Sequence, residues 1–306
     1  QHGTAIITTA ALINALDICG KSIKKIKVVV NGAGASAQAC TELFINSGVK
    51  SENIIMLDRK GVIYEGRKQG IDQWKSKYAV KSKHRTLADA VKDADVFLGL
   101  SAKGVLKKEM VKSMAKNPII FACANPDPEI KPEIIKEVRS DAIIATGRSD
   151  YPNQVNNLIG FPYIFRGALD VRAKEINEEM KVAAANAIAL LARENVPDEV
   201  VSAYGGDRPR YGKDYIIPST FDPRLISVIP TAVAAAAMKS GVARKNIVDL
   251  EIYKDQLTNR LDPTMSLMQG INAKVRKNPK KVIFAEGEDE NMLKAAIEFG
   301  RNKLGT

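Results

Sequence analysis

A glycine-rich turn is the first stretch of this sequence whose residues could do chemistry. It follows the apolar run at residues 26–30, precedes a helical pattern that stops at Gly48, and consists of Gly32, Ala33, Gly34, Ala35, Ser36 and Ala37. In such a G-x-G-x-x-A turn the first glycine permits a tight bend, the second lets the backbone approach a pyrophosphate, and the small third residue lets helix and strand pack closely. The N-terminus of the helix attracts phosphate. The pattern predicts dinucleotide binding; the alternative is a tight strand-to-helix turn without a ligand.

The acid that ends the next apolar run is the second candidate. Asp58 stands close to where the dinucleotide fingerprint places its ribose-binding acid, and it would bind the 2′-hydroxyl of NAD and repel the 2′-phosphate of NADP. Arg59 and Lys60 follow directly and could hold that phosphate. The local chemistry therefore leaves NAD and NADP open, and a solvated loop is the alternative for these residues.

The elements that must position these residues alternate along the first 150 residues. Helical apolar spacing covers residues 4–19 and ends at Gly20. Buried strands are predicted at 26–30, 53–58, 95–101, 118–126 and 141–150, and the helices between them at 36–47, 86–94, 107–115 and 131–138. This alternation predicts an α/β fold: a doubly wound, Rossmann-like parallel sheet with helices on both faces.

The pattern changes after Asp150. Residues 151–170 are rich in loops, and long helical runs follow at 172–194 and 224–238 with proline- and glycine-punctuated sequence between them. Residues 281–305 have the pattern of a new strand–turn–helix unit. We therefore expect a C-terminal helical segment after the sheet.

The composition is that of a soluble globular protein, with 45% hydrophobic and 26% charged residues among 306. The net charge is +11, but the lysines are scattered and no arginine-rich arm is present, so we expect no nucleic-acid partner. The apolar stretch at residues 4–19 is too short and too polar to span a bilayer, so we expect no membrane partner. Three cysteines far apart favour neither disulfides nor zinc and fit a cytoplasmic location.

Several long stretches resemble one family. QHGTA, NGAGASA, MLDRKGVIYEGR, CANPDPEI and GRSDYPNQVNNLIGFPYIFRGALDVRA are similar to bacterial NAD(P)-dependent malic enzyme of the large, two-module type. The resemblance covers about residues 1–270, and KKVIFAEGEDENMLKAA resembles the start of the phosphate acetyltransferase-like module that follows in such chains. It implies oxidation of malate by hydride transfer to NADP or NAD, then metal-assisted decarboxylation to pyruvate with Mg or Mn.

The resemblance also assigns site residues. Gly32, Gly34, Ala35, Ser36 and Ala37 match the pyrophosphate turn of the family, and Asp58 and Arg59 match its ribose end. Ser101 ends a strand on the side of the cofactor, although Lys103 stands where the family usually has proline. Asn125 matches an asparagine that reaches cofactor and substrate, and Asn156 and Asn157 match the pair that meets the substrate carboxylate. For Ser101 and the three asparagines, ordinary turn residues are the alternative.

The resemblance further implies what this sequence lacks. The catalytic Tyr and Lys of the family and its metal carboxylates precede the QHGTA stretch, so we assign no catalytic and no metal-binding residue and expect the isolated chain to be inactive. We expect a dinucleotide-binding domain at 1–157, a helical segment returning to the substrate domain with a linker at 158–272, and the start of the acetyltransferase-like module at 273–306. Helices 172–194 and 224–238 should expose apolar surface, which favours a homo-oligomer.

Two other function classes stay open from the sequence alone. One is a different NAD(P)-dependent dehydrogenase with its catalytic set inside these residues, for which Tyr151, Tyr163 and Tyr204 are candidate acids without a recognisable lysine partner. The other is a non-enzymatic dinucleotide-binding or interaction module, which an exposed apolar docking face would favour.

Overall fold

The computed structural model describes residues 1–203, 208–260, 271, 274–301 and 303–305. The chain divides into two compact units, Gln1–Leu250 and Glu251–Thr306, which are described separately. The division lies at residue 250, whereas domain boundaries were expected at 157 and 272; those expected boundaries stay predictions.

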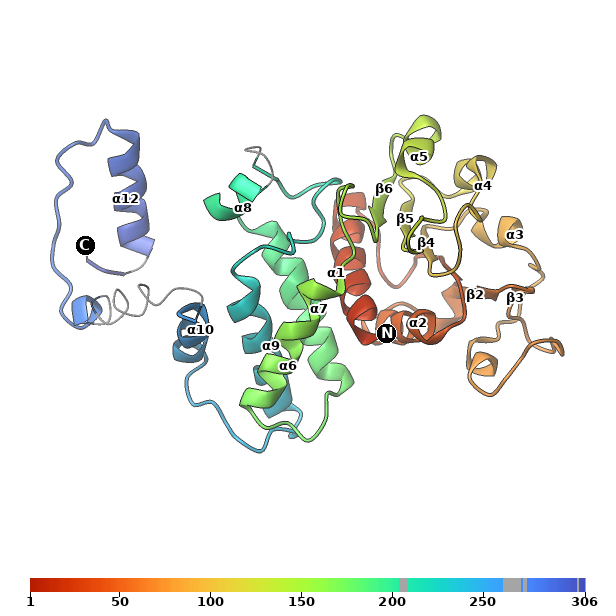
Figure 1. The fold of residues 1–306 in the computed structure, drawn as a ribbon, viewed down its shortest axis with the longest axis horizontal. Helices are drawn as coiled ribbons and strands as arrows, with labels where there is room; N and C mark the ends of the chain where they lie inside the picture. The colour runs from red at the N-terminus through yellow and green to blue at the C-terminus, as the bar shows by residue number, and fades with distance from the viewer. Residues whose placement is uncertain (204–207, 261–270, 272–273, 302, 306) are drawn as a thin grey trace. The chain divides into compact units, whose positions relative to one another are not determined.

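The first unit is built on a six-stranded sheet (Figure 1). Its order is β3-β2-β1-β4-β5-β6, with strands β1 Val28–Asn31, β2 Ile54–Asp58, β3 Gly61–Val62, β4 Val96–Gly99, β5 Ile119–Ala122 and β6 Ile143–Thr146. All neighbours run parallel except the edge strand β3, which pairs antiparallel with β2. The predicted parallel α/β fold is confirmed, and the strands are shorter than predicted because the polar residues at their ends lie in loops.

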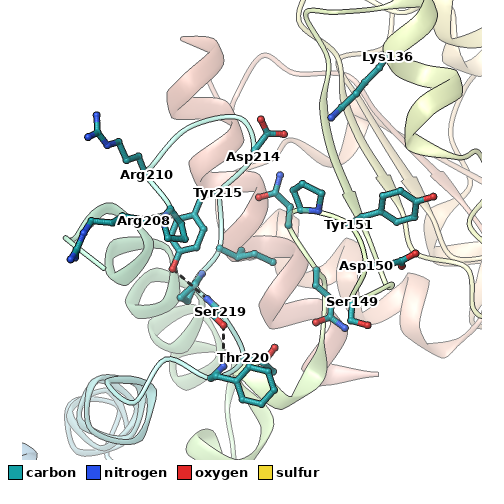
Figure 2. Close-up of a pocket in the computed structure, with 17 residues that line it drawn as sticks. Lys136, Ser149, Asp150, Tyr151, Arg208, Arg210, Asp214, Tyr215, Ser219 and Thr220 are labelled. Atoms are coloured by element: carbon teal, nitrogen blue, oxygen red, sulfur yellow. Dashed lines mark hydrogen bonds between the residues drawn. The ribbon is translucent and has the colours of Figure 1, made fainter. Parts of the chain in front are cut away.

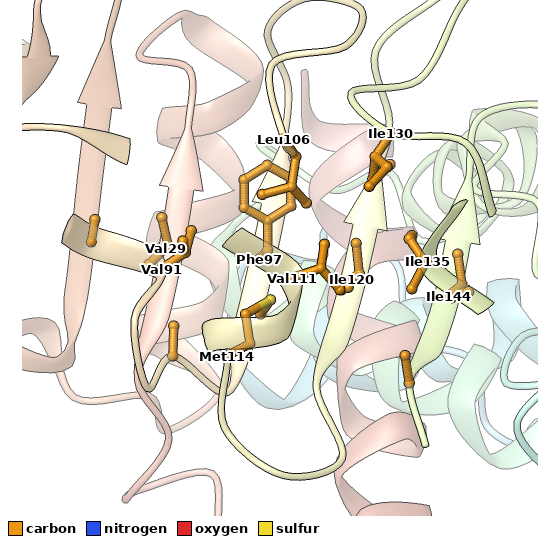
Figure 3. Packing of buried hydrophobic residues seen from close by; sticks show 14 of the residues in the cluster. Val29, Val91, Phe97, Leu106, Val111, Met114, Ile120, Ile130, Ile135 and Ile144 are labelled. Carbon is orange, nitrogen blue, oxygen red and sulfur yellow. The ribbon is translucent and has the colours of Figure 1, made fainter. Parts of the chain in front are cut away.

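Helices cover both faces of the sheet because its strands are apolar on both sides. On one face, Val29, Phe97, Ile120 and Ile144 stand in register as one row across β1, β4, β5 and β6. This row packs on Val91, Val111 and Ile135 from α3 Leu87–Val91, α4 Lys108–Ser113 and α5 Pro132–Val138 (Figure 3). Burial of the row thus fixes the sheet against these three short helices.

The opposite face carries α1 His2–Cys19 and α2 Ala35–Asn46, which contact β5 and β1 respectively. Helix α1 also packs on α7 Glu178–Arg193, so most of its residues are buried. This surrounding explains why α1 is apolar on all sides. By length and composition α1 is the one helix of the described residues that could cross a membrane, so the expectation that this stretch is too short and too polar for that is wrong, although most of the helix is buried within the protein.

Beyond the sheet, the two predicted C-terminal helices form as α7 and as α9 Leu225–Lys239, which pack on each other. Helices α6 Phe161–Asp170 and α8 Asp198–Ala203 were not predicted, and α6 corrects the expectation that residues 151–170 are rich in loops. Helix α10 Leu250–Thr258 lies almost entirely in the second unit. Helix α7 begins later than predicted, because Arg172 adopts a positive φ of 51° and the Asn177 side chain accepts the Met180 N–H as the N-cap. In the second unit α12 Glu290–Arg301 forms as predicted. The strand predicted before it is wrong: residues 281–284 pair with no neighbouring strand, and a strand needs such a partner.

A close helix crossing at Gly167 gives the first testable prediction. A Cβ on this residue of α6 would lie 2.6 Å from the carbonyl oxygen of Pro230 and 2.8 Å from Cβ of Val233 on α9. Gly167→Ala should therefore push the helices apart and lower the free energy of unfolding by about 1–3 kcal/mol. Urea unfolding measures this. Gly160→Ala is the control, because its Cβ would meet its nearest atom at 3.4 Å, and an equal loss in both variants would contradict the prediction.

Candidate functional site

The carboxyl ends of β1 and β4 mark the place where the sheet can accept a ligand. From β1 the chain continues to β2 on one side, and β4 then lies on the other side of β1. Ligands of open α/β sheets bind in the crevice at such a topological switch point. The predicted glycine turn leaves β1 at this point, so the fold places it where a dinucleotide would bind.

The two glycines of the turn have different physical requirements. Gly32 has a φ of +129°, and a Cβ there would lie 2.5 Å from the carbonyl oxygen of Leu100, so the backbone itself demands glycine. Gly34 has an ordinary φ of −78°, and a Cβ there would meet no atom within 4 Å. No backbone angle or contact within the described protein therefore requires glycine at this N-cap position, whereas close approach of a ligand to the backbone would require it.

The start of α2 is open to an anion. Gly34 is the N-cap residue and makes no side-chain cap, so no side chain takes the first N–H groups of the helix. The Gln38 amide instead donates to the carbonyl oxygen of Ala33 at 3.0 Å and holds the turn in place. Predicted residues Ala35, Ser36 and Ala37 form the first turn of this helix. A pyrophosphate at this position would meet free N–H donors and the positive end of the helix dipole.

The predicted ribose-binding acid, Asp58, ends β2 but is already engaged by cations. Its Oδ1 accepts hydrogen bonds from Arg67 Nη2 at 2.6 Å and from the Lys60 N–H at 2.9 Å, and Lys75 Nζ lies 3.5 Å from its Oδ2. Burial alone would raise the pKa of Asp58, but the hydrogen bonds from Arg67 and Lys60 outweigh burial and lower it. Asp58 is therefore an ionised carboxylate whose charge is offset, while Arg59 and Lys60 are exposed beside it.

Arg67 links the end of β2 to β3 and to the loop that follows. Besides Asp58, its buried guanidinium donates to the carbonyl oxygens of Gly61, Val62 and Gln69. Arg67→Met should lower the free energy of unfolding by about 1.5–3 kcal/mol, because these acceptors and the Asp58 charge lose a charged donor. Arg59→Met is the control. It replaces an exposed arginine directly after β2 and should leave the free energy of unfolding unchanged.

The loss caused by Arg67→Met should also depend on pH. Pairing lowers the pKa of Asp58, so the stabilisation exists above the unfolded-state pKa of about 3.9 and disappears as the pH falls through the folded-state pKa. The difference in unfolding free energy from the wild type should be larger at pH 7 than at pH 3, because only the part that comes from Asp58 depends on pH and the part from the three carbonyl acceptors remains. An undiminished difference at pH 3 would contradict the ion-pair explanation.

At the end of β4, predicted Ser101 belongs to a network that sequence reasoning missed. Its Oγ accepts a hydrogen bond from Asn31 Nδ2 at 2.8 Å and donates to Glu129 Oε1 at 3.3 Å. Glu129 is fully buried and also accepts the backbone N–H of Ser101 at 2.9 Å and of Ala124 at 3.0 Å. Because its proton is directed to Glu129, the exposed Ser101 hydroxyl offers a ligand an acceptor rather than a donor.

The three predicted asparagines fall into different settings. Asn125 follows β5 on an exposed loop, next to Ala124 of the Glu129 network, and precedes Pro126 through a cis peptide bond. The Asn156 side chain accepts the Leu158 N–H, which is the turn role named as its alternative. Asn157 is exposed, and its Oδ1 accepts the Thr4 hydroxyl at 3.1 Å, so it lies against the start of α1. The ligand roles of these residues stay predictions.

A cavity of about 750 Å³ lies elsewhere, beyond the end of β6 (Figure 2). One wall is the loop Ser149–Gln154 and the other contains Arg208, Arg210 and Tyr215. Asn153 joins the walls, because it donates to the carbonyl oxygens of Ile144 and Lys213 and accepts the Ile216 N–H. None of the predicted cofactor- or substrate-binding residues lines this cavity, so it is separate from the switch point. Tyr151, a candidate acid of the alternative dehydrogenase, does line it, whereas Tyr204 lies outside the described residues.

A divalent metal does not fit the residues that the structure describes. Within residues 1–203, 208–260, 271, 274–301 and 303–305, no group of three or more His, Cys, Asp or Glu side chains lies close enough to hold an ion. No step is therefore assigned to a metal held by these residues alone.

Comparison with known proteins identifies what this arrangement is similar to. Residues 1–202 match the family described as malic enzyme, NAD binding domain. The chain is 60% identical over 306 residues to the NADP-dependent malic enzyme of Rhizobium meliloti (strain 1021), covering all of this chain and 40% of that protein. It is 52% identical over 297 residues to the NAD-dependent malic enzyme of the same organism, covering 97% of this chain and 39% of that protein.

Solved structures match over most of the chain as well. The Entamoeba histolytica malic enzyme is 34% identical, with a TM-score of 0.75 over 100% of this chain and 60% of that one. The Pyrococcus horikoshii malic enzyme is 35% identical, with a TM-score of 0.74, and the match covers 90% of this chain and 61% of that one. The chain thus spans about 40% of the length of the first curated relatives it matches.

Proposed function

This chain belongs to the malic enzyme family, and from that premise we propose that it forms the dinucleotide-binding part of an enzyme that oxidises malate and decarboxylates it to pyruvate and CO2 with reduction of NAD(P). One observation carries the proposal: Gly34 at the switch point has no steric need to be glycine, yet it caps an open helix N-terminus. Close approach of a pyrophosphate to the backbone would explain why this residue is glycine.

In this proposal the chain binds and orients the dinucleotide. The nicotinamide of the bound dinucleotide accepts the hydride. The N–H groups at the start of α2 hold the pyrophosphate. The acceptor presented by Ser101 suits the NH2 group of the nicotinamide carboxamide, and the Asn125 amide can both donate and accept. Asn157, held by Thr4, is the candidate for the malate carboxylate.

We assign NADP as the preferred dinucleotide. Arg67 and Lys75 offset the charge of Asp58, so this acid repels a 2′-phosphate less than an unpaired acid would, and Arg59 is free to contact that phosphate. Arg59→Met should therefore weaken NADP+ binding about tenfold, or about 1.4 kcal/mol, and leave NAD+ binding unchanged. Calorimetric titration of both dinucleotides tests this, and an equal loss for both would exclude a contact specific to the 2′-phosphate.

The remaining family features extend the proposal to the longer protein. The Mg or Mn site and the acid–base groups would lie in parts of the family chains that these residues do not cover, and an acetyltransferase-like module would follow. Homo-oligomers in the cytoplasm are proposed too. An apolar stripe on α6 supports association, since Phe161, Phe165 and Leu169 are 49%, 41% and 67% exposed. The exposed stripe thus lies on α6, before the two helices named from the sequence, and of those two α7 exposes Leu190 at 60%.

The test is a calorimetric titration of the chain with NADP+ and then NAD+ at fixed ionic strength. Malate and Mn2+ are added afterwards, and the absorbance of the reduced cofactor is followed. Binding without turnover is expected. Turnover would place the acid, base and metal ligands within these residues, and no binding of either dinucleotide would overturn the proposal.

A further inference from the structure

Glu129 is a buried anion at the switch point without a cation beside it. It is 0% exposed, it lies between the ends of β4 and β5, and no Lys, Arg or His of the described residues forms a salt bridge with it. Burial raises the pKa of Glu129 even though backbone N–H groups donate to it. Burying a carboxylate costs free energy unless hydrogen bonds replace those it made to water. The hydrogen-bond partners of Glu129 therefore indicate its role.

Those partners are the Ser101 hydroxyl and two backbone N–H groups, which belong to the loops that carry predicted cofactor contacts. Oε1 accepts the Ser101 N–H and hydroxyl, and Oε2 accepts the Ala124 N–H. Ser101 follows β4, and Ala124 precedes Asn125 after β5. One carboxylate therefore bridges the two strand ends that carry predicted cofactor contacts.

The fold also leaves a space beside Gly99 that this carboxylate fills, which we call the carboxylate seat. Gly99, the last residue of β4, has no side chain, and a Cβ there would lie 2.3 Å from Cδ of Glu129 and 2.6 and 2.7 Å from its two oxygens. The absent side chain makes the space that the carboxylate fills. The N–H donors and the space are independent observations, and both fit a planar carboxylate.

We propose that Glu129 is a positioning residue: an internal carboxylate that neutralises the N–H donors of Ser101 and Ala124 and fixes the ends of β4 and β5 in the shape that accepts the dinucleotide. The inference rests on the proposed function, because the dinucleotide must bind at this switch point. It has a second consequence. With these two donors satisfied internally, they do not compete with the N–H groups of α2 for the pyrophosphate.

Chemical rescue tests the proposal in the full chain. Glu129→Ala removes the carboxylate and leaves a void that formate can enter. Without formate, the variant should bind NADP+ at least tenfold more weakly than the wild type and melt at a lower temperature. Sodium formate should restore affinity to within about threefold of the wild type and raise the melting temperature, whereas sodium chloride at equal ionic strength should do neither.

Two further variants separate positioning from general stability. Glu129→Gln keeps the shape but directs an NH2 donor at an N–H donor, so it should lose NADP+ affinity and gain nothing from formate, because no void exists. Glu137→Ala removes an exposed carboxylate of α5 and should match the wild type in every condition. If Glu129→Ala folds poorly, purification in formate and the glutamine variant still supply the comparison.

The outcomes are distinct from failure of the proposed function. If the wild type binds no dinucleotide, the proposed function fails, while formate rescue of the melting temperature still tests the carboxylate seat. If the wild type binds and Glu129→Ala binds equally well, Glu129 does not position the site. Rescue by chloride as strong as by formate, or no rescue of a destabilised Glu129→Ala, would also overturn the inference.

Discussion

Gly34→Ala should weaken dinucleotide binding strongly at little cost in stability. Gly34 has a φ of −78°, and an added Cβ would meet no protein atom within 4 Å, so the folded state accepts alanine. The methyl group would occupy the space through which a pyrophosphate approaches the N–H groups of α2. We expect a loss of affinity on the order of 100-fold, or about 2.8 kcal/mol, and a loss of stability below about 1 kcal/mol, because alanine is a poorer N-cap residue than glycine.

Two other glycines give this prediction its contrast. Gly32→Ala should lose both binding and stability, because alanine at a φ of +129° is strained and its Cβ would lie 2.5 Å from the Leu100 carbonyl oxygen. Gly212→Ala should lose neither, because its nearest atom would be 3.7 Å away. Calorimetry with NADP+ and urea unfolding measure the two effects separately. Unchanged affinity in a well-folded Gly34→Ala protein would show that no phosphate approaches this turn.

The sequence was sufficient for five of the six strands and for the turn, because these depend on local patterns, but it did not predict the two-residue edge strand β3. Short apolar runs predicted β1, β2, β4, β5 and β6, and the glycine spacing predicted the start of α2. It failed where a strand needs a distant partner: residues 281–284 have the composition of a strand but pair with no neighbouring strand.

The ion pairs and buried acids of the site are also beyond local patterns. Arg67 lies nine positions after Asp58 with β3 between them, and Glu129 lies 28 positions after Ser101, so neither pairing follows from periodicity. A signal existed for Glu129, which stands in the CANPDPE stretch directly after a buried strand. Its partners there are backbone N–H groups, and no side-chain pattern in the sequence marks them.

Gly99→Ala is the prediction with the largest expected effect on stability. The new Cβ would require the buried carboxylate of Glu129 to leave its seat, because the two groups would lie 2.3 Å apart. Moving that side chain breaks its bonds to the Ser101 and Ala124 N–H groups. Overpacking and the loss of hydrogen bonds to a charged group together should lower the free energy of unfolding by about 3–5 kcal/mol.

A double-mutant cycle shows whether the collision with Glu129 causes this loss. In the Glu129→Ala background the space beside β4 is empty, so Gly99→Ala should cost little more there and the two substitutions should couple by about 2 kcal/mol or more. Gly147→Ala, directly after β6, is the matched control, because its Cβ would lie 3.7 Å from the Cys123 carbonyl oxygen. Additive losses would mean that Gly99 serves the strand itself, and the close fit between glycine and carboxylate would then not be what holds β4 and β5 together at the switch point.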